Sequence, residues 1–281
     1  MPINYSAILP HGFDLIPELY PNTGQDWKKL IKGMEDVAKE IFACKPDIIV
    51  ISSPHNLRID GQIGVITTEW CQGTWWNEDK TKSVELKFSC EREFGLTLYK
   101  NIKQADLPVV SVNYGAADGE FSAMIMDWGT FIPMWFINQI YTKNKLEIPP
   151  MVLITPSREI PWENLIEVGR IINQLSISEN KEVVFIASAD HGHAHDEEGP
   201  YGYDTASKIF DDKVYQMIQR DELHKLLDFT EVFVDHAKPD SVWQMLILQG
   251  ILEETNLRNN LCIYECPTYY GMIVASFTKR N

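Results

Sequence analysis

Short runs of apolar residues alternate along the chain with longer stretches in which apolar residues fall three and four positions apart. Most of the short runs are continuous rather than alternating in polarity, which is typical of strands buried on both faces. They predict strands at residues 5–9, 47–52, 109–113, 151–155, 182–187, 231–234 and 271–277.

The longer stretches predict amphipathic helices. In the clearest, residues 26–44, Trp27, Leu30 and Met34 share one side, while charged side chains occupy the other. Further helices are predicted at residues 91–105, 161–175, 205–221 and 241–254, the last of them capped by Asp240 or Ser241.

Strands that alternate with helices indicate an α/β fold. We expect a single domain over residues 1–281, with a mixed, largely parallel sheet flanked by helices. Residues 61–82, which contain three glycines and three tryptophans, are expected to form a hairpin or a long loop within it.

Five of the seven histidines come just after a predicted strand. They are His11, His55, His191, His193 and His195. In open α/β sheets, ligands bind at the carboxyl ends of the strands, so these side chains can meet if their strands are parallel neighbours. The other two, His224 and His236, are interpreted as a surface residue and a turn or cap residue.

A metal site built on two histidines needs an anionic ligand if the metal is Fe(II) or Zn(II), and two histidines with one carboxylate are typical of non-haem Fe(II). Glu265 is a candidate because it lies among apolar and aromatic residues, with no Lys or Arg between Arg258 and Lys279. A carboxylate in such surroundings needs a metal or a cation. The alternative is a glutamate at the sheet edge that faces water.

The stretch from Ala187 to Asp196 holds three histidines at alternate positions. In an extended chain alternate residues point the same way, so His191, His193 and His195 can share a face. The stretch can supply a general acid and base, or a zinc site of a hydrolase. Its His-Gly-His-Ala-His-Asp order differs from that of the metallo-β-lactamase type.

Composition excludes several classes of function. The 281 residues include 25 basic and 40 acidic side chains, a formal net charge of −15, which disfavours nucleic acid and anionic membrane surfaces as partners. No apolar run approaches the length of a membrane span. With the first lysine at Lys28 and five scattered cysteines, we expect no signal peptide and a cytoplasmic protein with reduced thiols.

Four segments together resemble the class III extradiol ring-cleaving dioxygenases, the superfamily of the catalytic subunit of protocatechuate 4,5-dioxygenase. They are Pro10-His11-Gly12, Ser53-Pro54-His55, the stretch 187–195 and Glu265-Cys266-Pro267-Thr268-Tyr269-Tyr270-Gly271-Met272. The last segment looks like the branch that contains 2-aminophenol 1,6-dioxygenase. The resemblance runs nearly end to end.

The resemblance implies that His11, His55 and Glu265 bind Fe(II). It implies that His193, at the end of a Ser-x-x-x-x-His stretch, is the catalytic acid and base, with His195 as the alternative. The expected reaction inserts O₂ into the ring of a catechol or o-aminophenol. The expected assembly is a homodimer, with or without a small second subunit.

One position departs from the family pattern. Many members carry Asp-His-Gly in mid-chain, where this sequence has Asp127-Trp128-Gly129. Because that histidine helps to bind substrate in the family, Trp128 keeps open a third reading, a non-catalytic binding protein of the same fold.

Overall fold

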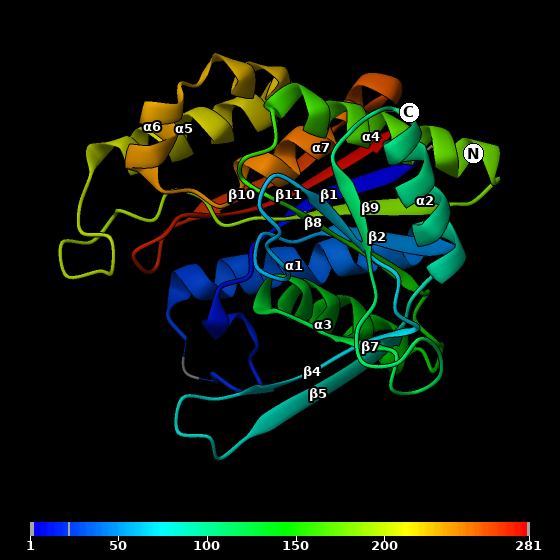
Figure 1. Ribbon diagram of the computed structural model, residues 1–281. Helices are drawn as coiled ribbons and strands as arrows, with labels where there is room; N and C mark the ends of the chain where they lie inside the picture. The colour runs from blue at the N-terminus through cyan, green and yellow to red at the C-terminus, as the bar shows by residue number, and fades with distance from the viewer. Residues whose placement is uncertain (1–2, 22, 280–281) are drawn as a thin grey trace.

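The computed structural model describes residues 3–21 and 23–279. Its largest element is an eight-stranded sheet with helices on both faces (Figure 1). The strands, in spatial order, are β10 (Leu257–Glu265), β11 (Met272–Lys279), β1 (Tyr5–Leu9), β9 (Val183–Ser188), β2 (Ile48–Ser52), β8 (Met151–Pro156), β3 (Ile63–Ile66) and β6 (Val109–Val112). A smaller sheet has the order β5 (Ser83–Ser89), β4 (Trp70–Trp76) and β7 (Ala123–Ile125).

The centre of the large sheet is parallel. β1 pairs in parallel with β9, β9 with β2, and β2 with β8. β10, β11 and β3 run antiparallel to their neighbours β11, β1 and β8. This confirms the predicted α/β architecture with a mixed, largely parallel sheet. The carboxyl ends of β1, β9, β2 and β8 therefore lie along one edge.

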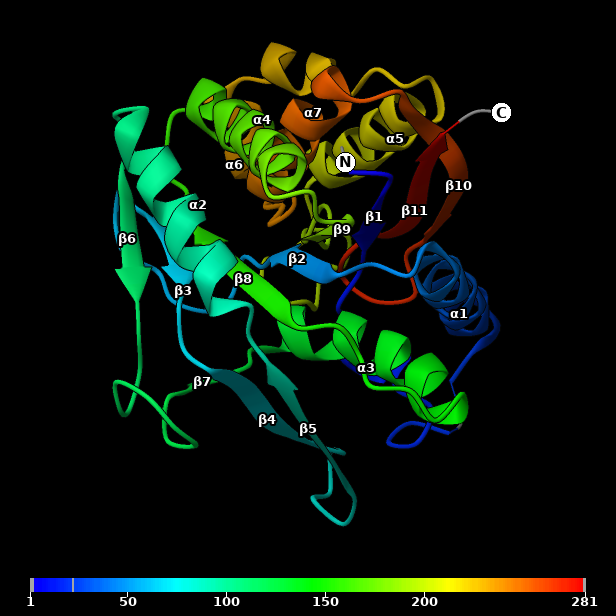
Figure 2. The same ribbon diagram turned by 90° about the vertical axis from the view of Figure 1, so that its right-hand side faces the viewer.

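The helices form two layers (Figure 2). One layer shares a core with one face of the sheet and comprises α2 (Arg92–Gln104), α4 (Trp162–Ser178), α5 (Thr205–Gln219), α6 (Glu231–Ala237) and α7 (Val242–Glu254). The other comprises α1 (Gln25–Cys44) and α3 (Trp128–Lys143), with the small sheet beyond α3. Two 3-10 helices, η1 (Phe13–Leu15) and η2 (Leu223–Asp228), complete the fold. Of the helices in the described residues, none has the length and apolar character to cross a membrane.

The central strands are apolar on both faces because each face meets its own core. In β2, Ile48 and Val50 belong to the core under α4 and α7, whereas Ile49 and Ile51 belong to the core under α1 and α3. Alternate side chains of a strand point to opposite faces, so a continuous apolar run is what a strand covered on both sides needs.

The predicted strand at residues 231–234 is wrong, because this segment is the start of α6. Its β-branched valines favour a strand, but the Thr230 side chain caps a helix by accepting a hydrogen bond from the Phe233 N–H at 3.2 Å. Val232 is 70% exposed, so the apolar run does not mark a buried strand here.

Helix α3 was not predicted because it lacks a polar face. Ten of its residues are buried, and Pro133 lies inside it, so neither the helical period nor the usual residue preferences identify it. Asp127 begins the helix by accepting a hydrogen bond from the Thr130 N–H. The segment 61–82, expected to be a hairpin or loop, supplies β3 to the large sheet and β4 to a hairpin with β5.

Two glycines allow α4 and α7 to approach closely. A Cβ atom at Gly250 in α7 would overlap the carbonyl oxygen of Ile166, and one at Gly169 in α4 would overlap that of Ile247. Backbone atoms cannot yield as a flexible side chain can, so the spacing of this helix pair requires glycine at both positions.

We expect Gly250→Ala to lower the free energy of unfolding by about 2–3 kcal/mol, because overpacking forces two helix backbones apart. Urea unfolding measures this change. Gly24→Ser is the matched control, since no atom lies within 4 Å of a Cβ there and serine is accepted at a helix N-cap. Equal stability of Gly250→Ala and the wild type would contradict the packing described.

Candidate metal centre

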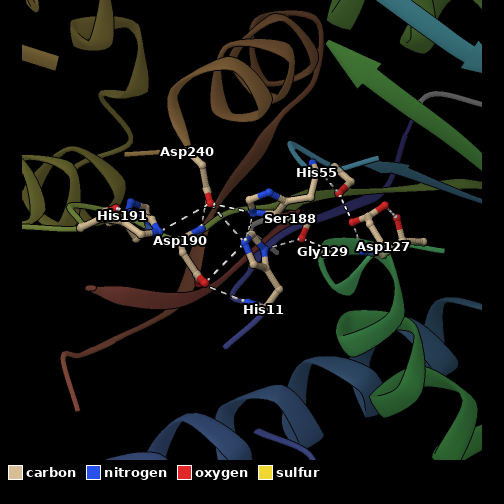
Figure 3. A network of polar contacts seen from close by, with 11 residues as sticks. His11, His55, Asp127, Gly129, Ser188, Asp190, His191 and Asp240 are labelled. Atoms are coloured by element: carbon tan, nitrogen blue, oxygen red, sulfur yellow. Dashed lines mark hydrogen bonds and ion pairs between the residues drawn. The ribbon is translucent and has the colours of Figure 1, made fainter. Parts of the chain in front are cut away.

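The loops that follow β1, β9 and β2 bring their polar residues to one point at the sheet edge (Figure 3). His11 follows β1, His55 follows β2, and Asp190 follows β9 between them. A fourth residue, Asp240, comes from the turn between α6 and α7. The histidine-bearing strands are parallel neighbours, so the condition for convergence is met.

His11, His55 and Asp240 point their donor atoms at one another. The two Nε2 atoms lie 3.0 Å apart, and Asp240 Oδ2 lies 3.0 Å from His55 Nε2 and 3.3 Å from His11 Nε2. Adjacent ligands on an octahedral ion with bonds of about 2.1 Å are separated by about 3.0 Å. Throughout residues 3–21 and 23–279, this is the one set of three histidine, cysteine or acidic side chains close enough to share an ion.

The hydrogen bonds around His11 leave the correct nitrogen free for a metal. Ser188 Oγ donates to the carbonyl oxygen of Gly129, so it can only accept at its 2.9 Å contact with His11 Nδ1. His11 Nδ1 therefore carries a proton, and Nε2 is the ring nitrogen that faces His55 and Asp240. The residues present thus fit a divalent cation bound by two imidazoles and one carboxylate.

Two backbone contacts fix Asp240 in this position. Asp240 Oδ1 accepts the Asp190 N–H at 2.9 Å, and the Asp240 N–H donates to the Asp190 carbonyl oxygen at 3.3 Å. The Asp190 carboxylate in turn accepts the His11 N–H at 3.1 Å. The turn before α7 and the loop after β9 are therefore joined next to His11.

The buried carboxylates and imidazoles shift one another's pKa. Burial lowers the pKa of His11, but the negative charges of Asp190 and Asp240 outweigh it and raise that pKa to about 9. Burial raises the pKa of Asp190 to about 7. Burial also opposes ionisation of Asp240, yet His11 and His55 hold its pKa well below the ordinary value. The two carboxylates therefore stabilise positive charge at the point where His11, His55 and Asp240 meet.

Glu265, which was predicted as the third ligand, is not part of this group. It lies at the end of β10, and its Oε1 is 2.6 Å from Lys29 Nζ of α1. No Lys or Arg lies near Glu265 along the chain, but in the folded protein Lys29, 236 positions away, forms an ion pair with it. Asp240 lies beside the two histidines instead, and its position before a predicted helix had suggested only a helix cap.

The three histidines of the 187–196 stretch do not converge. His193 Nε2 lies 3.8 Å from Asp240 Oδ2, whereas His195 Nε2 lies 2.8 Å from Asp211 Oδ2. His191 is fully buried, with neither ring nitrogen hydrogen-bonded within the described structure. The zinc site considered for a hydrolase therefore has no common centre, and His193 is the histidine of this stretch that faces Asp240.

His193 and His195 differ in charge as well as in position. Burial lowers the pKa of His193, which keeps the ring neutral at pH 7. Burial also acts to lower the pKa of His195, but its hydrogen bond to Asp211 outweighs this and raises the pKa to about 9. His195 is therefore an imidazolium held by a buried carboxylate.

Asp211 organises the loop that carries His193. Its Oδ1 accepts the Gly192 N–H at 2.7 Å, and its Oδ2 accepts from His195 and from the Tyr264 hydroxyl at 2.9 Å. The Asp211 side chain is fully buried. No sequence pattern pointed to Asp211. It lies in α5, whose exposed face carries other polar residues, so nothing in the sequence marked this carboxylate as buried.

Aromatic side chains pack against His55 and His193. Trp128 stacks on His55 with ring centroids 4.3 Å apart, and Tyr270 stacks on His193 at 5.2 Å. Asp127, beside Trp128, accepts a hydrogen bond from Ser53 Oγ at 2.6 Å. Trp128 thus lies against His55, at the position where the sequence departs from the family pattern.

Residues 5–275 match the profile of a family described as the catalytic LigB subunit of aromatic ring-opening dioxygenase. Protein CA_C1420 of Clostridium acetobutylicum is 24% identical over 265 residues, which cover 94% of this chain and 55% of that protein. The chain thus spans about half the length of this relative. The crystal structure of the uncharacterized protein JW3007 from Escherichia coli K12 superposes with a TM-score of 0.55 at 14% identity, covering 97% of this chain and 99% of the other, which shows a shared fold.

The His195–Asp211 pair makes a prediction about pH. Because the folded-state pKa of His195 is raised from 6.5 to about 9, the stability that this pair contributes is complete below pH 6.5 and is lost as the pH rises through 9. We expect the free energy of unfolding to fall by about 1–3 kcal/mol more in the wild type than in Asp211→Asn over that range. Urea titrations at both pH values measure the difference, with His195→Gln as a second variant. Parallel pH profiles in wild type and both variants would refute the pairing.

Proposed function

Because the chain belongs to the family of the catalytic LigB subunit of aromatic ring-opening dioxygenases, we propose that it is an Fe(II)-dependent extradiol-type dioxygenase. The proposed substrate is a catechol or an o-aminophenol, and the second substrate is O₂. The observation that carries the proposal is the mutual approach of His11, His55 and Asp240 donor atoms to 3.0–3.3 Å.

The ligand set supports Fe(II) as the proposed metal. Two imidazoles and one carboxylate on one side leave the remaining positions open to exchangeable ligands. The chemistry supplied by bound Fe(II) is the joint activation of the aromatic substrate and O₂ at those open positions. The burial of His11 and Asp240 limits the access of water to the ligands.

His193 is the proposed acid and base. Its Nδ1 lies 2.5 Å from the carbonyl oxygen of His191, so Nδ1 carries the proton and Nε2 is the acceptor. Nε2 faces Asp240 at 3.8 Å, and the lowered pKa keeps it unprotonated at neutral pH. It can therefore accept the proton of a substrate hydroxyl and return it later in the reaction.

The aromatic side chains beside His193 and His55 support the proposal of a flat, aromatic substrate. Tyr270 packs against His193, and Trp128 packs against His55, so both the proposed base and a proposed ligand are backed by rings. These contacts restrict both imidazoles to one orientation.

A homodimer in the cytoplasm, with or without a small second subunit, remains part of the proposal.

We expect His11→Ala and Asp240→Ala each to weaken metal binding at least about 10-fold, because each removes one of three protein ligands. Anaerobic equilibrium dialysis against Fe(II), followed by metal analysis, gives the affinity. Glu265→Gln is the matched control and should bind as the wild type does, since its carboxylate pairs with Lys29. Loss of metal in Glu265→Gln with retention in Asp240→Ala would reverse the ligand assignment.

We expect His193→Ala to keep the metal and to lose about 10²–10⁴-fold in turnover, as removal of a general acid and base does. O₂ uptake by the Fe(II)-loaded protein with a panel of catechols and aminophenols measures the turnover. His195→Gln should lose much less, because its ring faces Asp211. Stoichiometric iron with no O₂ uptake for any compound would instead favour a non-catalytic binding protein.

A further inference from the structure

Two cysteines outside the metal centre have their sulfur atoms in contact. Cys71 lies in β4 and Cys90 directly follows β5, and their Sγ atoms are 3.4 Å apart. All five cysteines of the chain lie in the described residues, and each is a free thiol. A buried cysteine commonly serves as a small apolar side chain, but two thiols in contact can also be oxidised to a disulfide. The pair is therefore a candidate redox site.

The backbone of the β4–β5 hairpin holds the two cysteines on one face. Cys71 pairs with Phe88 of β5, and the Cys90 N–H donates to the Glu69 carbonyl oxygen at 2.9 Å. Cys90 therefore lies opposite a residue two positions before Cys71, so the two side chains are diagonal neighbours. Diagonal neighbours are farther apart than directly opposed ones, so an S–S bond here would pull β4 toward the end of β5. A disulfide formed in this way would be strained and readily reduced, as reversible oxidation requires.

The two thiols differ in exposure and in acidity. Cys71 is fully buried, whereas Cys90 is partly exposed. The hydrogen bond between the two sulfur atoms lowers the pKa of Cys90, although burial opposes this, because Cys71 can donate to the Cys90 thiolate. The same hydrogen bond and burial raise the pKa of Cys71. Cys90 is therefore the thiol that ionises and meets an oxidant from solvent, and Cys71 is the partner that stays protonated.

Strand β4 connects the cysteine pair to the start of α3. The Met126 N–H donates to the carbonyl oxygen of Gln72 in β4 at 2.8 Å, so β4 holds the segment that ends at Asp127. Asp127 caps α3, and the next residue, Trp128, stacks on His55 with ring centroids 4.3 Å apart. A pull on β4 would therefore reach the side chain that packs against His55.

We propose that Cys71 and Cys90 are a redox modification site, which hydrogen peroxide converts to a disulfide, and that this conversion shifts the surroundings of His55. The Cys90 thiolate attacks one peroxide oxygen, the O–O bond breaks, and the other oxygen leaves as hydroxide, which takes up a proton to become water. The Cys71 sulfur then attacks the Cys90 sulfenic acid. The S–S bond forms, and the sulfenic oxygen leaves as water with the Cys71 proton. Two thiols and one peroxide thus give one disulfide and two waters, and a small thiol reverses the oxidation by exchange.

The first test counts free thiols by mass spectrometry after the reduced protein has been treated with hydrogen peroxide, denatured and alkylated. We expect the count to fall from five to three, because one disulfide consumes two thiols, and dithiothreitol to restore all five. The joined peptides should contain Cys71 and Cys90. Cys71→Ser should leave Cys90 as a sulfenic acid that dimedone traps, whereas Cys90→Ser should leave Cys71 reduced. Cys44→Ser is the matched control and should form the same disulfide as the wild type.

The second test records NMR spectra of protein with isotope-labelled histidines before and after oxidation. We expect the ring signals of His55, identified with His55→Gln, to shift, while those of the exposed His224 stay in place. Peroxide-treated Cys90→Ser should show no shift at His55, which separates disulfide formation from other effects of peroxide.

Five alkylated cysteines in the peroxide-treated wild type would overturn the proposal, and this measurement needs no variant to fold. A disulfide that joins other cysteines would also overturn it. A disulfide between Cys71 and Cys90 with unchanged His55 signals would support the modification site and overturn its link to the metal centre. Neither measurement depends on turnover, so failure here leaves the dioxygenase proposal standing.

Discussion

The site depends on the placement of β9 between β1 and β2, with all three strands parallel. Parallel neighbours end at the same edge, so the residues that follow them are brought within contact distance without any long loop. The strands can lie together because both of their faces are covered by apolar cores. If β9 were displaced from this position, His11 and His55 would be separated, and Asp240, held through Asp190, would lose its support.

A second constraint is the charge that the fold buries at this edge. Asp190 and Asp240 are both nearly inaccessible to solvent, and burial of two carboxylates is costly unless cations or hydrogen bonds compensate. Backbone N–H groups compensate in part, since Asp190 accepts from His11 and Asp240 accepts from Asp190. A divalent cation at the imidazole nitrogens would complete the compensation, and metal binding would then be thermodynamically linked to the folding of this edge.

The sequence sufficed for the central strands of the sheet, for family membership and for the placement of His11 and His55 at strand ends, because each depends on short local runs of residues. It did not predict β10. The sequence did not predict contacts whose partner residue is distant along the chain. Glu265 looked unpaired because Lys29 is remote in sequence, and Asp240 looked like a helix cap because its approach to the histidines arises only when α7 packs. Helix α3 was not predicted, because a largely buried helix has no amphipathic period.

The close contact between Asp211 and Gly271 constrains how this protein can evolve. A Cβ atom at position 271 would overlap Asp211 Oδ2, while the Gly271 backbone pairs with both His191 and Gly192. Position 271 therefore cannot gain a side chain while residue 211 is aspartate without moving the backbone segment that carries His193. Larger residues at position 271 become acceptable only when residue 211 becomes smaller, so the two positions form an epistatic pair in which the order of substitutions matters.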